Sequence, residues 1–177
     1  SNAADAKGLL KSACRMDDPI LFLEHKGLYR QGYASSNEPS EKYLLEFGKA
    51  NIIQQGDDIT IVTWGALVQK SIEASKNTSF SVEIIDMRTL NPLDFECIIK
   101  SIKKTSRLIV AHEDNLTGGF GAEIVSRISD FAFEYLDAPV KRVASKDSPI
   151  AYAQNLEDEI LVQVDWIIDC INEVGNY

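Results

Sequence analysis

The regular alternation of β-branched runs with amphipathic segments between residues 43 and 177 is the feature that most constrains the fold of this chain. Val and Ile dominate the runs, and apolar residues recur at helical spacing in the segments between them. The expected strands cover residues 48–54, 58–64, 81–90, 107–113 and 138–144, and the expected helices cover residues 66–76, 91–105, 121–132 and 157–174. Strands and helices in this order build crossover units, so residues 43–177 are predicted to form a three-layer α/β sandwich around a mainly parallel sheet.

The first part of the chain departs from this pattern. Residues 1–3 resemble the remnant of an affinity tag and are set aside. A helix is expected over residues 4–15, and a buried strand followed by a polar exit is expected over residues 20–30; both elements need a neighbour to bury their apolar faces. Residues 31–42 have the composition of a linker, so a domain boundary is placed there. Because no initiator Met is present, we expect the chain to be a fragment of a longer protein.

Charge and cysteine content narrow the function classes. The net charge of −9 argues against nucleic acid as a partner, because binding a polyanion needs clustered Lys and Arg. Cys14, Cys97 and Cys170 lie far apart among apolar residues, as expected of buried thiols in a reducing compartment. Neither His25 nor His112 pairs with a cysteine at metal-ligand spacing. With no visible signal peptide, and no apolar run near the roughly 20 residues that span a bilayer, no membrane partner and a cytoplasmic location are expected.

The stretch Ala111–Ile124, AHEDNLTGGFGAEI, is the strongest candidate site, because ligands of open α/β sheets bind at the carboxyl ends of strands. It fails the dinucleotide pattern, since Ile124 stands where the final glycine is required. Neighbouring acids would oppose a phosphate at the start of the following helix. Adjacent strand residues point to opposite faces, so His112 and Glu113 are not expected to work as an acid–base pair.

A structural role accounts for this stretch better. Gly118 and Gly119 allow a tight turn, and Gly121 lets the following helix approach a neighbour closely. Thr117 or Asn115 is expected to cap that helix. A close-packing turn of this kind suits a subunit interface, for which the expected residues are His112, Glu113, Gly118, Gly119, Phe120 and Gly121.

Three other positions have simple expected roles. Asn91 is expected to cap the helix that follows it. Arg88, at a strand end, is expected to anchor a carboxylate or a backbone carbonyl. Trp64 is expected to be a core or interface aromatic residue, because the string TWG lacks the serine of a nucleophile elbow.

Seven motifs occur in order along the chain: DAKGLLKSACR, ILFLEHKGLYR, ITIVTWG, IIDMRTLNPLD, LIVAHEDNLTGGFGAEI, YLDAPVKRV and the terminal NY. Together they resemble the C-terminal half of the beta subunit of thiamine-diphosphate-dependent 2-oxoacid dehydrogenases, over nearly all of residues 4–177. The resemblance implies a transketolase C-terminal type of domain with a five-stranded, mostly parallel sheet over residues 43–177, and the tail of a truncated pyrimidine-binding domain over residues 4–30. The strings TWG, LYR and LTGGF favour the branched-chain (2-oxoisovalerate) type over the pyruvate type.

The resemblance also implies the chemistry of the parent enzyme, which is oxidative decarboxylation of a branched-chain 2-oxoacid with acyl transfer to a lipoyl group. In the family, thiamine diphosphate and magnesium bind between other domains, and the nearest match here to the Gly-Asp-Gly diphosphate motif is Gly56-Asp57-Asp58. No catalytic or cofactor-binding residue is therefore expected in this chain, and the isolated fragment is expected to be inactive. Its expected role is assembly as a homo-dimer, with the other subunits of the dehydrogenase component and the lipoyl acyltransferase core as partners.

Four further site residues follow from the resemblance alone. Some beta subunits hold a structural potassium ion by backbone carbonyls just after the first helix, and the matching positions here are Ala13, Met16 and Asp18. Met16 stands where some relatives have Asp, which matters less for a carbonyl ligand. The Asp of the family's LDAP string lies near the surface used by the acyltransferase, which points to Asp137 as a further interface residue.

Two other interpretations stay open. A free-standing flavodoxin-like module would bind a small anion or a regulator at residues 118–121. The C-terminal domain of a transketolase or a deoxyxylulose-phosphate synthase would share the fold, although such proteins match the string HEDNLTGGFGAE less well.

Overall fold

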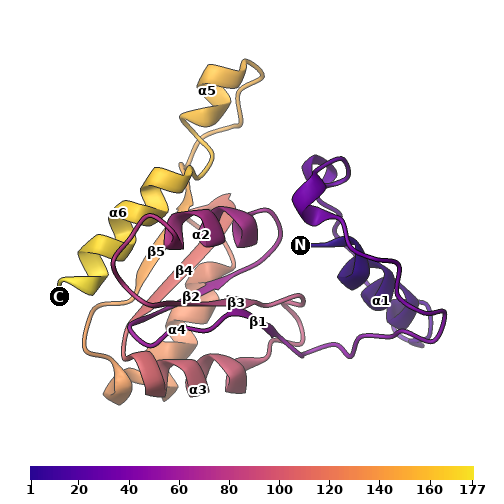
Figure 1. Ribbon diagram of the computed structural model, residues 1–177, viewed down its shortest axis with the longest axis horizontal. Coiled ribbons are helices and arrows are strands. Elements are labelled where there is room, and N and C mark those ends of the chain that lie inside the picture. The colour runs from indigo at the N-terminus through magenta and orange to yellow at the C-terminus, as the bar shows by residue number, and fades with distance from the viewer.

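The computed structural model describes residues 1–177 and places one five-stranded sheet between two layers of helices (Figure 1). The strands are β1 (Asn51–Gln54), β2 (Ile59–Thr63), β3 (Val82–Asp86), β4 (Leu108–Asn115) and β5 (Lys141–Ser145). Their order in the sheet is β1-β3-β2-β4-β5, with β1 antiparallel to β3 and every other neighbouring pair parallel. The predicted three-layer α/β sandwich with a five-stranded, mostly parallel sheet is confirmed.

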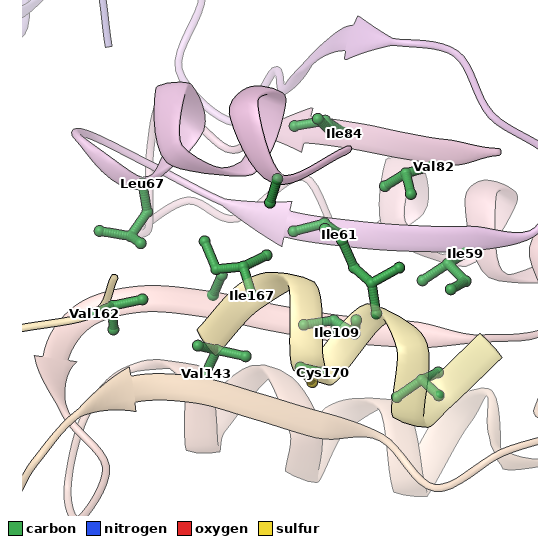
Figure 2. Packing of buried hydrophobic residues seen from close by; sticks show 14 of the residues in the cluster. Ile59, Ile61, Leu67, Val82, Ile84, Ile109, Val143, Val162, Ile167 and Cys170 are labelled. Atoms are coloured by element: carbon green, nitrogen blue, oxygen red, sulfur yellow. The ribbon is translucent and has the colours of Figure 1, made fainter. Parts of the chain in front are cut away.

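The helices divide between the two faces of the sheet. On one face lie α2 (Leu67–Ser75) and α6 (Val164–Gly175), and on the other lie α3 (Phe95–Thr105) and α4 (Gly121–Phe131). Figure 2 shows Ile167 and Cys170 of α6 directed toward Ile61 and Ile109 of the sheet. Successive strand residues point to opposite faces, so Val62 belongs to the second cluster, beneath α3 and α4.

The expected strand over residues 20–30 is wrong. This segment has no strand; it contains one short 3-10 turn, η1 (Lys26–Leu28), and a second, η2 (Gly32–Ala34), follows it. A strand needs a neighbour for its backbone hydrogen bonds, and the edges of the sheet are formed by β1 and β5. Leu21 and Leu23 consequently remain 85% and 79% exposed.

The last helix is shorter than expected, because the chain is interrupted between α5 (Gln154–Asp158) and α6. The Ile160 carbonyl accepts the backbone N–H of Lys146, and the Val162 carbonyl accepts a hydrogen bond from the Lys70 ammonium. These two bonds tie the residues between α5 and α6 to Lys146, just after β5, and to Lys70 of α2. The α5 segment stands away from the sheet, as Figure 1 shows.

The capping prediction for Asn91 is also wrong, because Asp94 caps α3. One Asp94 carboxylate oxygen accepts the N–H of Cys97 at 3.2 Å, and the other accepts the N–H of Ala50 at 2.9 Å. Asp94 thus satisfies a free helix N–H and joins the helix to the segment before β1.

The N-terminal helix α1 (Ala3–Ala13) agrees with the helix expected over residues 4–15. Asn2 caps it, since its side chain accepts the N–H of Asp5 at 2.9 Å, so residues 1–3 take part in the fold. A further 3-10 turn, η3 (Phe133–Tyr135), follows α4. No helix in the structure is both long enough and apolar enough to span a membrane.

The three cysteines differ in exposure, which corrects the expectation that all are buried. Cys14 is exposed, Cys97 is half-buried and Cys170 is buried. Burial raises the pKa of Cys97 to about 11 and that of Cys170 to about 12, so both stay protonated and unreactive. We expect iodoacetamide at mildly alkaline pH to modify Cys14 rapidly and the other two only after unfolding. Mass spectrometry of the labelled peptides checks this, and early labelling of Cys170 would contradict the packing of α6.

Candidate functional site

The carboxyl ends of β2 and β4 form the point where the strand order reverses, which is the usual ligand crevice of an open α/β sheet. Thr63 pairs with Ala111 in the sheet, so the next residues, Trp64 and His112, follow side by side. Their rings are stacked, with centroids 5.5 Å apart and planes 4° apart, and Phe120 meets the Trp64 ring edge-on at 6.3 Å. Side chains of the chain itself therefore fill this crevice.

The glycine turn after β4 closes over the His112 ring. A Cβ atom on Gly121 would lie 2.3 Å from His112 Cδ2, and one on Gly119 would lie 2.7 Å from Cε1. Gly118 has a φ of +78°, in the left-handed region that favours glycine. The predicted close approach at Gly121 is confirmed, and the neighbour is a buried residue of the same chain. The wider interface role of this turn stays a prediction.

His112 is fully buried, and neither of its ring nitrogens has a hydrogen-bond partner. Burial lowers the pKa of His112 below its ordinary value of 6.5. The charge of Arg142 adds to this shift, and Asp114 works against it. The ring is therefore neutral in the folded protein and packs as an aromatic side chain.

This burial predicts a pH dependence of stability. The unfolded chain protonates His112 near pH 6.5 and the folded chain only at lower pH, so the unfolded state binds more protons between the two values. We expect the free energy of unfolding to be unaffected by His112 above pH 6.5 and to fall below it, by at most about 1.4 kcal/mol per pH unit. Urea unfolding at several pH values measures the slope. His112→Gln should reduce the slope of the free energy of unfolding against pH. The control, His25→Gln, should leave the contribution of His112 in place. An unchanged slope in His112→Gln would show that His112 is not the origin of the pH dependence.

Glu113 lies on the side of β4 opposite His112, as the strand alternation predicts. Its two carboxylate oxygens lie 3.0 and 3.2 Å from His25 Nε2, and both side chains are about one-third exposed. This contact ties the irregular segment after α1 to the carboxyl end of β4. His112 and Glu113 do not form an acid–base pair.

A second contact joins α1 to the carboxyl end of β3. The Arg88 guanidinium donates to both carboxylate oxygens of Asp5, at 2.7 and 2.9 Å, and both side chains are largely buried. Arg88 has a φ of +55°, and its N–H donates to Asp86 at 3.0 Å, which holds this bend. The prediction that Arg88 anchors a carboxylate is confirmed.

A polar pocket of about 640 Å³ lies beyond the carboxyl ends of β4 and β5. On one side Thr117 donates its hydroxyl to Asp147 at 2.6 Å and its backbone N–H at 2.8 Å. These two bonds lower the pKa of the exposed Asp147 carboxyl. Thr117 therefore does not cap α4, and neither does Asn115, because the N-cap position of that helix is Phe120, with no side-chain bond. The remaining lining residues are Asn115, Ser148, Pro149 and Ile150.

The family of this chain follows from a comparison of its sequence with family models. The family described as "Transketolase, C-terminal domain" matches residues 48–167, which include all five strands. The chain belongs to this family. Its motifs from β2 to β5, including the glycine turn, are thus those of a transketolase C-terminal domain.

Curated proteins of similar sequence share one name, pyruvate dehydrogenase E1 component subunit beta. The chain is 40% identical over 177 residues to the mitochondrial pyruvate dehydrogenase E1 component subunit beta of Dictyostelium discoideum, covering 98% of this chain and 50% of that protein. It is 42% identical over 181 residues to the pyruvate dehydrogenase E1 component subunit beta of Cyanidium caldarium, covering 100% of this chain and 54% of that one. The chain spans about half the length of the curated relatives it matches.

A solved structure supports the fold. A split-gene transketolase, described as an inactive beta4 tetramer, superposes with a TM-score of 0.77 at 22% sequence identity. The match covers 99% of this chain and 55% of that one, so it includes α1 and the irregular segment as well as the transketolase C-terminal domain.

The residues of this domain do not fit the diphosphate of thiamine diphosphate. Glu113, Asp114 and Asp147 surround the carboxyl ends of β4 and β5 with negative charge, which repels an anionic group. The nearby Arg142 guanidinium already donates to the Leu116 carbonyl at 2.5 Å. The start of α4 also carries Glu123 in its first turn, which weakens the attraction of the helix dipole for an anion.

The remaining predicted residues lie at separate places. The Ala13 carbonyl accepts the N–H of Met16 at 3.1 Å where α1 ends, and Asp18 is exposed beyond it, so the potassium site there stays a prediction. The N–H of Asp137 donates to the Ser106 carbonyl at 2.8 Å, at the amino end of β4. Asp137 and the glycine turn therefore lie at opposite ends of the sheet and do not form one surface.

Sequence reasoning missed two contacts of the site, the Trp64–His112 stack and the His25–Glu113 pair. The Trp64–His112 stack could have been predicted, because the residues that directly follow two neighbouring parallel strands lie side by side. The second joins positions 88 residues apart and has no local signal.

Proposed function

We propose that this chain is the C-terminal part of the beta subunit of a thiamine-diphosphate-dependent 2-oxoacid dehydrogenase. The observation that carries the proposal is the 40–42% identity to pyruvate dehydrogenase E1 beta subunits along essentially the whole chain. The parent reaction is oxidative decarboxylation of a 2-oxoacid with acyl transfer to a lipoyl group. We place this reaction in the cytoplasm, in keeping with the three free thiols.

The role that we propose for this part is assembly. The stacked Trp64 and His112 rings fill the crevice where an α/β sheet would bind a ligand, and acidic groups surround its carboxyl edge. Thiamine diphosphate and magnesium would then be held by other domains of the parent, and the isolated chain would be inactive. The proposed partners are the other subunits of the dehydrogenase component, a second copy of this chain, and the lipoyl acyltransferase core.

The substrate that we propose first is pyruvate, because relatives that are 40–42% identical to this chain are named pyruvate dehydrogenase E1 beta subunits. A branched-chain 2-oxoacid is the second candidate, favoured by the strings TWG, LYR and LTGGF. A comparison of kcat/KM for pyruvate and 3-methyl-2-oxobutanoate separates the two, since a pocket shaped for one distinguishes them by differential transition-state binding.

The test of the proposed reaction uses the full-length beta subunit together with its alpha subunit, thiamine diphosphate and magnesium. We expect release of carbon dioxide from a 2-oxoacid and acylation of a lipoyl domain, with no activity when the beta subunit is left out. If neither of the two 2-oxoacids is decarboxylated, the proposal is contradicted.

The acyltransferase surface has a separate test at Asp137, which is exposed at the amino end of β4. We expect Asp137→Lys to weaken binding of the acyltransferase's subunit-binding domain by about tenfold or more, because reversing a charge at an interface replaces an attraction by a repulsion. Calorimetric titration measures the affinity, with Glu134→Lys on the neighbouring turn as the matched control. Equal binding by both variants would remove Asp137 from this surface.

A further inference from the structure

A second pocket, of about 590 Å³, lies between the loop that follows β3 and the glycine turn that follows β4. In the sheet β2 lies between these two strands, so the pocket borders the edge at which open α/β sheets bind ligands. Its volume falls within the roughly 300–1,000 Å³ that is usual for small-molecule sites. The place and the size of this pocket therefore suit a small ligand.

Three large apolar side chains line the pocket. Leu90 and Leu93 come from the loop after β3, and Phe120 comes from the glycine turn. All three are half-buried, so they offer apolar surface to a ligand without closing the pocket. Phe120 also meets the Trp64 ring edge-on, which holds its position. An apolar group of a ligand is expected to pack on these side chains.

Two residues of α4 bring opposite charges to the same pocket. Glu123 and Arg127 lie one helical turn apart, where side chains are neighbours with Cβ atoms about 5–6 Å apart. They form no ion pair with each other or with any other residue. The Arg127 guanidinium instead lies 4.3 Å from the centre of the Phe95 ring. Both charges therefore remain available to a ligand.

The glycine turn adds unpaired hydrogen-bonding groups. The backbone N–H groups of Gly118, Gly119 and Phe120 donate no hydrogen bond within the chain, and all three residues line the pocket. Gly119 also contacts the fully buried His112 ring, whose two nitrogens have no partner. Consecutive free N–H groups in a turn bind anionic groups. Because Glu123 would repel a simple anion, the ligand must carry a positive charge next to its negative one.

We propose that this pocket binds an α-amino acid with an apolar side chain. Such a molecule carries its carboxylate and its ammonium on one carbon atom, which matches two opposite charges one helical turn apart. The carboxylate binds Arg127 and the N–H groups of the turn, and the ammonium binds Glu123. The side chain packs on Leu90, Leu93 and Phe120. The glycine turn is also part of the predicted subunit interface, so the bound amino acid would act on assembly.

Calorimetric titration of the 177-residue chain with three compounds of similar shape tests the proposed ligand class. The compounds are L-leucine, 4-methylpentanoate, which lacks the ammonium group, and 3-methylbutylamine, which lacks the carboxylate. We expect one leucine to bind per chain, and each of the other two to bind about tenfold more weakly or less, because each leaves one protein charge without a partner.

Two variants test the proposed position of the ligand. Glu123→Gln is expected to weaken leucine binding by about tenfold or more and to remove the preference for leucine over 4-methylpentanoate. Arg127→Met, which keeps packing on Phe95, is expected to weaken it similarly and to remove the preference over 3-methylbutylamine. The matched control is Asp130→Asn, an exposed residue of the same helix that does not line the pocket, and it should bind leucine as the wild type does.

Three results would overturn the proposal. They are the absence of saturable binding at millimolar leucine, equal binding of the three compounds, and binding of leucine by Glu123→Gln and Arg127→Met as tight as that by the wild type. Circular dichroism of every variant checks that the fold is retained. The site is argued from its cavity and charges and not from the proposed reaction, so a failure here leaves the proposed 2-oxoacid decarboxylation untouched.

Discussion

Gly121→Val is expected to lower the free energy of unfolding by about 3 kcal/mol, because the new side chain must enter space that the His112 ring already occupies. The ring cannot move aside easily, since Trp64 is stacked on it and Val110 lies 3.2 Å from the same Cβ position. Chemical denaturation with urea measures the loss.

The control for this prediction is Gly32→Val. No atom lies within 4 Å of the Cβ position of Gly32, and its φ is not in the left-handed region. A surface change of this kind is expected to stay within about 0.5 kcal/mol of the wild type. Equal stability of the two variants would show that the glycine turn does not close over His112.

Arg88→Met is expected to release α1 from the sheet. The substitution keeps the length of the side chain but leaves the Asp5 carboxylate buried without its partner, which costs about 3 kcal/mol or more. That cost falls on the docking of α1 and not on the sheet, whose strands keep their ladder of hydrogen bonds. Hydrogen exchange should show protection in α1 falling by about a hundredfold, with protection in β2 and β4 unchanged.

The matched control is Lys7→Met, which removes the Lys7–Glu38 pair of 2.8 Å. Glu38 is 85% exposed and stays hydrated without its partner, so exchange in α1 should change little. Loss of α1 protection to the same extent in both variants would mean that the buried Asp5–Arg88 pair has no special role in docking.

The parts of the fold that the sequence predicts correctly are those governed by local pattern. Residues 59–63 are β-branched throughout, and Val82, Ile84 and Ile85 continue this pattern in the equally buried strand 82–86, so the alternation of strands and helices follows from the apolar runs. The stripe on residues 121–131 likewise predicts the face of α4 that packs on the sheet.

The errors lie where tertiary contacts override local signals. Residues 20–24 have the apolar composition of a strand, yet they pair with neither edge strand of the sheet, β1 or β5. Residues 160–163 have helical spacing, but the Ile160 carbonyl bonds to the N–H of Lys146 and the Val162 carbonyl bonds to the ammonium of Lys70. Asn91 is a favourable residue type for a helix cap, but Asp94 caps α3 instead. The second carboxylate oxygen of Asp94 also accepts the N–H of Ala50, which a sequence pattern does not reveal.

In the candidate site, too, features set by local sequence could be predicted, and features set by tertiary contacts could not. The strand-to-helix turn, the failed dinucleotide pattern and the anchoring role of Arg88 could be read from residue types and spacing. The filling of the crevice by Trp64 and His112 depends on the register of β2 against β4, which the sequence does not give directly. This filled crevice is the physical reason why we propose assembly, and not cofactor binding, as the role of the chain.

Calorimetric titration of the chain with thiamine diphosphate and magnesium tests the central claim most directly. If the cofactor is held by other domains of the parent, the titration should show no saturable heat, and hydrogen exchange around residues 111–124 should not change. Saturable binding of one thiamine diphosphate per chain, with protection of the glycine turn, would contradict the claim that this part of the protein serves assembly alone.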